Sequence, residues 1–220
     1  MSSVRLILSL QAIRGSSSSY GIVTSYTFKT HSAPPYAWVY NYTWHLSYEE
    51  GAQILETWQS YVDQNTLPVE LGNYMEFRRG LVKENVTLSM WGVWYNVNQT
   101  ELSFSILDSF FEKLANITVV PVVTLQGGTY IDSVRILGQP YPLDNVHTAP
   151  DVNDTFYVKS LMIPETSPLS NTAWTAFTKY LAEEGYDSPL VSHFFISCLS
   201  CDMIRIGSCK LNSTEVIIRL

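Results

Sequence analysis

Apolar and polar residues alternate in two ways along the chain. Between Trp38 and Leu46 every second residue is aromatic or aliphatic, which is typical of a strand with one buried face. From Glu49 to Gln64 apolar residues recur at helical intervals, and Ser47 and Glu50 have the spacing of a capping box. β-Branched and aromatic runs predict further strands at residues 22–29, 74–79, 86–95, 117–125 and 155–162, and amphipathic runs predict helices at 101–115, 129–137 and 170–184.

Strands and helices alternate after Pro34 and Pro35, which are typical of a linker. This order predicts an α+β domain, in which helices cover one face of a mostly antiparallel sheet. Gly127 and Gly128 are interpreted as a break after the strand predicted at 117–125. No internal repeat is visible.

Composition narrows the class of protein. Of the 220 residues, 46% are hydrophobic and 15% are charged, which excludes a disordered chain. The net charge of −7 and the absence of a Lys/Arg run argue against nucleic-acid binding, and no apolar stretch has the length of a membrane span. The 29 aromatic residues suit sheet faces, a core or a carbohydrate-binding groove.

Three cysteines, Cys198, Cys201 and Cys209, all lie near the C-terminus, a pattern that fits neither a disulfide framework nor a metal site. Six N-x-[ST] sequons are present, where chance predicts about two. They predict a secreted glycoprotein modified at Asn41, Asn85, Asn98, Asn116, Asn153 and Asn212. The alternative is that Thr-rich strands create sequons by accident. Residues 1–10 form only a weak signal-peptide pattern and fit an internal start better.

Small residues dominate the stretch that precedes the strand predicted at 22–29. Ala12-Ile-Arg-Gly15 is followed by four serines and by Tyr20-Gly-Ile-Val-Thr24. Small residues let backbone N–H groups approach a dinucleotide pyrophosphate closely, and serine hydroxyls add hydrogen bonds. The alternative is an ordinary serine-rich surface turn.

This stretch resembles the end of the FAD-binding (PCMH-type) domain of FAD-linked oxidases, in particular the fungal berberine-bridge-like and glucooligosaccharide-oxidase-like group. Residues 154–161 resemble a segment of the substrate domain in the same group. The resemblance implies FAD as the cofactor, with a cofactor site made of Gly15, Ser16, Ser17, Gly21, Ile22 and Val23. It also implies oxidation of a small-molecule substrate, a carbohydrate or another alcohol. Ser16 and Ser17 replace glycines of the family pattern.

The family's flavin-attachment domain and its C-terminal segment have no counterpart in this sequence. We therefore expect a truncated fragment that does not hold FAD tightly and whose catalytic residues are unknown; both an active and an inactive chain stay open. Residues 1–33 are expected to be the C-terminal edge of an FAD-binding domain, 34–187 the substrate-binding domain, and 188–220 an off-family tail. We expect the tail to be poorly integrated, although residues 191–196 and 216–218 are apolar enough to form genuine strands.

Substrate contacts are expected on two strands. Tyr74, Glu76 and Arg78 alternate onto one strand face, and Trp94 lies near the end of another strand. The alternative is that Glu76 and Arg78 form a solvated pair and that the aromatics are core residues. Two other functions stay open: a secreted, non-enzymatic carbohydrate- or surface-binding module, and a non-functional gene fragment. Flavin absorbance of the purified protein separates the oxidase from the binding module.

Overall fold

The computed structural model describes residues 27, 29–64, 67–68, 70–95, 105–138, 143, 158–163, 167–188, 193–199 and 213–219. The chain divides into two compact units, residues 1–33 and residues 34–220. The strand predicted at 22–29 lies almost wholly outside the described residues. All the helices and strands described below belong to the second unit.

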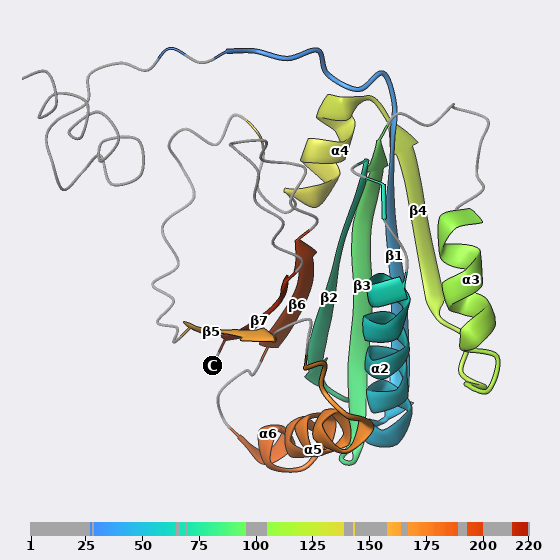
Figure 1. Cartoon of the computed structure of the whole chain (residues 1–220), viewed down its shortest axis with the longest axis vertical. Helices are drawn as coiled ribbons and strands as arrows, with labels where there is room; N and C mark the ends of the chain where they lie inside the picture. Colours follow the sequence, from blue (N-terminus) through green and yellow to red (C-terminus); the bar gives the residue numbers. More distant parts are fainter. Residues whose placement is uncertain are drawn as a thin grey trace, which may run out of the picture. The chain divides into compact units, whose positions relative to one another are not determined.

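A seven-stranded sheet runs through the second unit in the order β4-β1-β3-β2-β6-β7-β5 (Figure 1). Each of the six strand pairings is antiparallel, which confirms the predicted sheet type. The strands are β1 (Ala37–Ser47), β2 (Leu71–Arg79), β3 (Asn85–Tyr95), β4 (Val122–Gly128), β5 (Val158–Ile163), β6 (His193–Leu199) and β7 (Ser213–Arg219).

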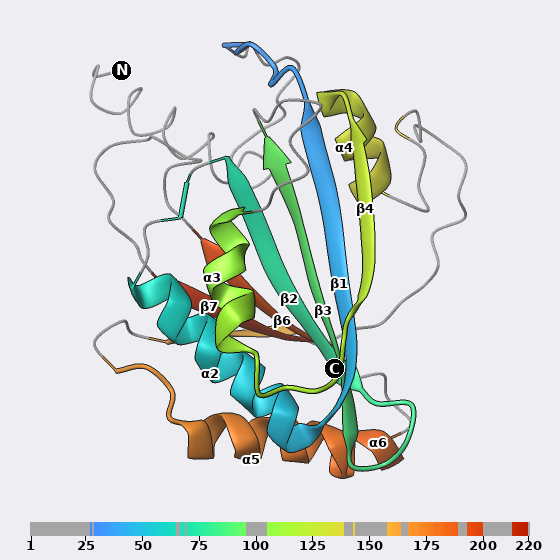
Figure 2. The same ribbon diagram turned by 90° about the vertical axis from the view of Figure 1, so that its right-hand side faces the viewer.

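Helices cover the sheet, so the predicted α+β class is confirmed. They are α2 (Tyr48–Gln64), α3 (Ser105–Lys113), α4 (Tyr130–Leu137), α5 (Asn171–Ala182) and the single turn α6 (Glu184–Asp187). Helices α2 and α3 lie on one face of the sheet and α4 on the other (Figures 1 and 2). We call the face under α2, α3 and α5 the helix face.

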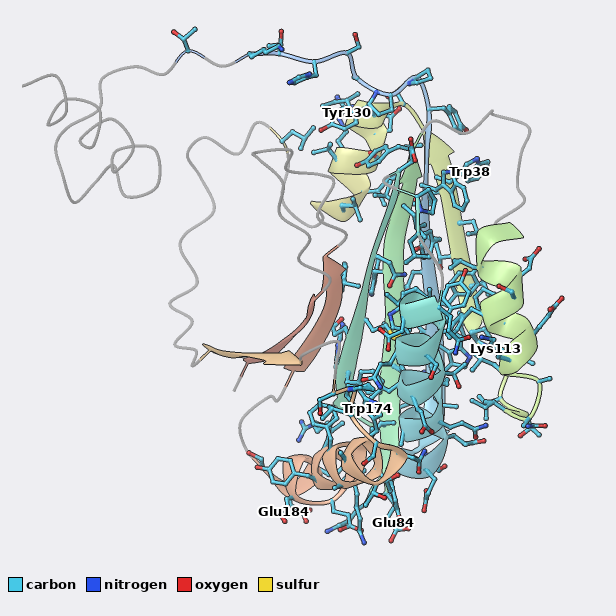
Figure 3. The ribbon with its side chains drawn as sticks, in the orientation of Figure 1. Trp38, Glu84, Lys113, Tyr130, Trp174 and Glu184 are labelled. Atoms are coloured by element: carbon cyan, nitrogen blue, oxygen red, sulfur yellow. The ribbon has the colours of Figure 1, made fainter. Side chains whose placement is uncertain are left out.

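The core lies between the helix face and its helices. Alternate residues of β1 supply Tyr40, Trp44 and Leu46, all almost fully buried, as the predicted alternation requires. The helices contribute large buried side chains to the same cluster, namely Trp58 and Tyr61 from α2 and Phe110 from α3. Trp174 of α5, labelled in Figure 3, belongs to it as well. A smaller apolar cluster on the opposite face joins Ala37, Val39 and Val93 to Ile136 of α4.

Polar contacts fix the start of α2 and its packing on α5. The Glu50 N–H donates to Ser47 Oγ (3.2 Å) and the Ser47 N–H donates to Glu50 Oε2 (3.1 Å), which confirms the predicted capping box. The Gln59 side-chain amide donates to the Leu169 carbonyl (3.0 Å) and accepts from the Leu169 N–H (3.1 Å). The Thr178 hydroxyl donates to the Tyr48 carbonyl (2.8 Å). Helix α2 is therefore tied both to the residue before the N-cap of α5 and to Thr178 within α5.

Two features of β4 differ from the sequence expectation. The strand begins at Val122 rather than at residue 117, and it runs on through Gly127 and Gly128, which were interpreted as a break. Thr43 pairs with Val122, so the next position along the register falls on Pro121, which lacks the N–H that the ladder needs. At the other end, a Cβ on Gly127 would lie 2.5 Å from the Tyr36 hydroxyl. Glycine is needed there because aromatic side chains occupy the space.

Residues beyond 188 join the sheet. β6 pairs with β2 from Tyr74–Ser197 to Arg78–His193, and β7 pairs with both β6 and β5. The expectation of a poorly integrated tail is therefore wrong, and the alternative of genuine strands is the one that the structure shows. The division of the chain into three segments, and a separate origin for residues 188–220, stay predictions. Of the three cysteines, Cys198 lies in β6, and Cys201 and Cys209 lie outside the described residues.

Candidate functional site

The sheet face opposite the helix face carries mostly polar side chains on its three central described strands. β1 contributes Asn41, Thr43 and His45, β3 contributes Thr87, Ser89 and Trp91, and β2 contributes Tyr74, Glu76 and Arg78. We call these nine residues the polar face. Residues at alternate strand positions point to the same side, so the register sets them in three rows across the sheet. The central row is Thr43, Ser89 and Glu76.

An ion pair anchors the β2 side of the polar face. Arg78 donates twice to Glu76, from Nε to Oε1 (2.8 Å) and from Nη2 to Oε2 (2.6 Å). The Glu76 side chain is 7% exposed and that of Arg78 is 46% exposed. The hydrogen bond to Glu76 raises the pKa of Arg78. The expected solvated pair is thus a buried carboxylate held by a half-exposed guanidinium, which fixes both groups in one geometry.

Hydroxyl and amide groups continue the polar face across β3 and β1. The hydroxyls of Thr43 and Ser89 share a hydrogen bond of 3.1 Å, and Thr43 also donates to Asn41 Oδ1 (3.2 Å). One row along, His45 Nδ1 and the Thr87 hydroxyl share a bond of 3.0 Å. These groups offer several donors and acceptors side by side, an arrangement suited to a ligand rich in hydroxyl groups.

Two aromatic residues face each other across the β2–β3 ladder. Tyr74 pairs with Trp91 in the register, next to the row that contains Glu76. Burial, followed by the charge of Glu76, raises the pKa of Tyr74 above its ordinary value of 10.0. The indole Nε1 of Trp91 is buried and has no hydrogen-bond partner within the described part of the chain. A buried indole N–H normally finds an acceptor, so the polar face holds a donor whose acceptor is not among the described residues; the indoles of Trp38, Trp58 and Trp174 are in the same situation elsewhere.

Trp94 is not brought together with the other expected substrate contacts. It pairs with Leu71 and Trp38 in the register and packs against the core cluster on the helix face. The sequence analysis chose Trp94 and missed Trp91, Thr43 and Ser89. The missed residues occupy the polar positions of two predicted strands, so their alternation was visible, but the register that joins them to Glu76 was not.

Other expected sites are only partly within the described residues. Gly15, Ser16, Ser17, Gly21, Ile22 and Val23, the residues expected to bind FAD, lie outside them. Among the sequons, Asn98, Asn153 and Asn212 also lie outside. Asn116 is exposed in the turn after α3, Asn85 begins β3, and Asn41 is half-buried within β1.

The described residues hold no group of three or more His, Cys, Asp or Glu side chains arranged to bind a metal ion. Within the same residues, no helix combines the length and apolar character of a membrane span.

No protein-family model matches the chain, and no curated protein matches its sequence. Solved structures do match its fold. BBE-like 1 from Physcomitrella patens superposes with a TM-score of 0.69 at 20% identity, over 94% of this chain and 44% of that one. Glucooligosaccharide oxidase from Acremonium strictum gives 0.67 at 19% identity, over 87% and 39%. Berberine bridge enzyme from Eschscholzia californica gives 0.59 at 14% identity, over 84% and 35%.

The fold resemblance predicted from the sequence is therefore confirmed. The chain spans 35–44% of the length of these solved structures. The Acremonium oxidase carries FAD bonded to a cysteine and a histidine, and a berberine bridge enzyme variant has been solved with (S)-reticuline.

Proposed function

We propose that the chain forms the substrate-binding part of an FAD-dependent oxidoreductase, and that the polar face receives the substrate. The observation that carries the proposal is the Glu76–Arg78 pair, with its buried carboxylate, beside Tyr74 and Trp91, whose indole N–H has no partner among the described residues. These groups lie on a sheet whose fold matches solved flavin-linked oxidases. A fixed ion pair, two aromatic rings and a row of hydroxyls together offer both apolar contact and directional hydrogen bonds.

The substrate that fits the polar face best is a carbohydrate or a similar alcohol. Sugars present apolar C–H faces, which pack on aromatic rings, and hydroxyl rims, which need paired donors and acceptors. Trp91 and Tyr74 supply the rings, and the indole N–H and the phenol O–H are both hydrogen-bond donors. The carboxylate of Glu76 supplies acceptors, and Arg78 orients it. One solved structure with the same fold is a glucooligosaccharide oxidase, and this match supports a carbohydrate as the substrate class.

FAD, when bound, supplies the electron acceptor for such an oxidation. The residues proposed to hold it are Gly15, Ser16, Ser17, Gly21, Ile22 and Val23, and this assignment rests on the sequence motif. The described residues of the chain have the narrower task of binding the substrate and orienting its hydroxyl group. Secretion and N-glycosylation are proposed on the same basis, from the six sequons.

A binding titration tests the role of the polar face. Tryptophan fluorescence of the purified chain is followed as cello- or chito-oligosaccharides are added. The Trp91→Phe and Glu76→Gln variants should each weaken binding about tenfold, the effect of losing a directional hydrogen bond or a charged acceptor. The matched control is Trp94→Phe, because Trp94 lies on the helix face. If Trp91→Phe and Trp94→Phe weakened oligosaccharide binding equally, the polar face would not be the substrate-binding surface.

A flavin assay separates the oxidase from a non-enzymatic binding module. The chain is incubated with FAD and dialysed, and its flavin absorbance and oligosaccharide oxidation are measured. Sugar binding without flavin retention or turnover would favour the module. Retention of flavin together with turnover supports the oxidase and contradicts the expectation that this chain does not hold FAD tightly. Absence of both sugar binding and flavin retention would favour the non-functional fragment.

A further inference from the structure

Strand β4 is an open edge of the sheet. It stands at one end of the strand order and, among the described strands, pairs only with β1. Its first six residues, 122–127, are all exposed. In an antiparallel pair, every second residue turns its N–H and C=O away from the partner strand, so β4 presents a row of backbone donors and acceptors on its outer side. Such an edge is a template for another strand.

The chain segment that contains β4 carries no charge, and the nearest charged side chain along the sequence, Asp132, lies beside the end of the strand at Gly128. No Asp, Glu, Lys or Arg occurs in the 18 residues from Leu114 to Ile131, although 15% of the chain is charged and about three such residues would be expected. Val120 is 83% exposed and Val122 is 65% exposed. Folded proteins usually protect an edge strand with Lys, Pro or a bulge, and the seven residues of β4 contain neither Lys nor Pro. Exposed Tyr130 and Ile131 begin α4 directly after the strand (Figure 3).

We infer that β4 binds the β4 strand of a second copy of this chain, in an antiparallel pair about a twofold axis. The open row of backbone groups can pair with another strand, and an antiparallel pair of identical strands is self-complementary. Each copy carries a net charge of −7, so two copies repel each other over most of their surfaces. The uncharged strip at β4 is where they can meet with the least repulsion.

The size of this surface sets the expected affinity. A seven-residue strand is about 24 Å long, and one pair of such strands buries less than the roughly 1,600 Å² of a standard interface. Contacts from Val120 and from Tyr130 and Ile131 must add to it. We therefore expect a weak, concentration-dependent dimer with a Kd on the order of 10 µM.

Sedimentation velocity of the full chain, from about 1 to 200 µM, tests the inference. The wild type should shift from monomer to dimer across this range. Val122→Lys and Thr124→Lys each place two charges at the pair, one from each copy, and should weaken dimerisation at least about tenfold. Val82→Lys is the matched control: Val82 is 55% exposed but lies in the hairpin between β2 and β3, and should leave the dimer unchanged.

Hydrogen exchange supplies an independent readout. Backbone amides of β4 should become more protected as the concentration of wild-type protein rises, and those of Thr124→Lys should not. Circular dichroism melting shows which variants are folded, and Thr124→Lys alters only an exposed polar side chain. A wild type that stays monomeric throughout, a dimer that survives both lysine variants, or unlimited growth into larger species would each overturn the inference.

Discussion

The ring of Tyr40 lies across Gly92, its partner in the β1–β3 register. A Cβ placed on Gly92 would lie 2.2 Å from the Tyr40 hydroxyl oxygen and 2.3 Å from the carbonyl oxygen of Gly72. Asn73 donates to the Tyr40 hydroxyl (2.9 Å), and this hydroxyl donates to the Gly72 carbonyl (3.4 Å). Gly92 of β3 therefore provides the space for the buried ring of Tyr40, whose hydroxyl reaches across β3 to partners on β2.

Replacing Gly92 with alanine should destabilise the fold strongly. Neither the buried ring of Tyr40 nor the Gly72 backbone can move aside cheaply, so we expect a loss of about 2–4 kcal/mol in the free energy of unfolding. Chemical denaturation measures it. Gly72→Ala is the control, because its Cβ would meet only a Val93 methyl group at 3.3 Å. Similar losses for the two variants would contradict the space-filling role of Gly92.

The Glu76–Arg78 pair predicts non-additive stability effects. Arg78→Met leaves the Glu76 carboxylate without its guanidinium and should cost about 2 kcal/mol, below the range for fully buried pairs, because Arg78 is half-exposed. Glu76→Gln combined with Arg78→Met should recover part of this loss, because no isolated buried charge remains. Denaturant unfolding of both single variants and the double variant gives the coupling. A double variant that costs the sum of the single losses would refute a coupled pair.

The lowered pKa of Asp132 predicts that the start of α4 is sensitive to acid. Hydrogen bonds from the Thr129 hydroxyl (2.6 Å) and then the Thr129 N–H (3.0 Å) lower the pKa of Asp132 from its ordinary value of 3.8. A lowered folded-state pKa stabilises the fold above 3.8, and this stabilisation disappears as the pH falls through the folded value. Amide exchange in α4, corrected for intrinsic rates, should accelerate between about pH 4 and pH 2. In Asp132→Asn this dependence should vanish; a dependence that persists would assign it to another group.

The described sequons should differ in occupancy. Asn116 is exposed in a turn, whereas Asn41 lies within β1 between two paired strands, and its Oδ1 accepts a bond from Thr43. Expressed in a secretory host, the protein should carry a glycan at Asn116 and none at Asn41. Glycopeptide mass spectrometry reads the occupancy directly. Asn116→Gln should remove the mass of one glycan, and Asn41→Gln should remove none; a glycan at Asn41 would contradict the folded position of that residue.

Removing the residues after 188 should destabilise the domain. The truncation deletes β6 and β7, which uncovers the β2 edge beside Tyr74 and Arg78 and leaves β5 without its partner. We expect a loss of about 3 kcal/mol or more, the scale of a core strand. Deleting residues 1–33, which form a separate unit, is the control and should change the stability by less than about 1 kcal/mol. If the full chain and the C-terminally truncated chain had equal free energies of unfolding, residues 189–220 would contribute no stability, as the sequence-based expectation of a poorly integrated tail requires.

Sequence reasoning succeeded where the determining interactions are local. The Ser47–Glu50 capping box and the alternation of Tyr74, Glu76 and Arg78 each depend on a few neighbouring residues. The fold class followed from the same periodicities together with the family resemblance.

It failed where a partner strand decides the outcome. Residues 117–121 are β-branched enough to form a strand, yet the ladder with β1 stops at Val122, because Pro121 cannot donate the next bond. Trp91 and Trp94 are equally aromatic, and only the pairing of Trp94 with Leu71 shows that it faces the core while Trp91 pairs with Tyr74. Strand β6 was not expected to join the sheet, because its partner β2 lies more than 100 residues earlier in the sequence.

The separation of the core from the polar face has an evolutionary consequence. Mutations at Thr43, Thr87, Ser89 or Trp91 would change the chemistry offered to a ligand while leaving Tyr40, Trp44, Leu88 and Met90 of the same strands in place. Selection for fold and selection for ligand preference thus act on alternate residues of the same strands. A lineage built on this sheet can drift among substrates by single substitutions, without passing through unfolded intermediates.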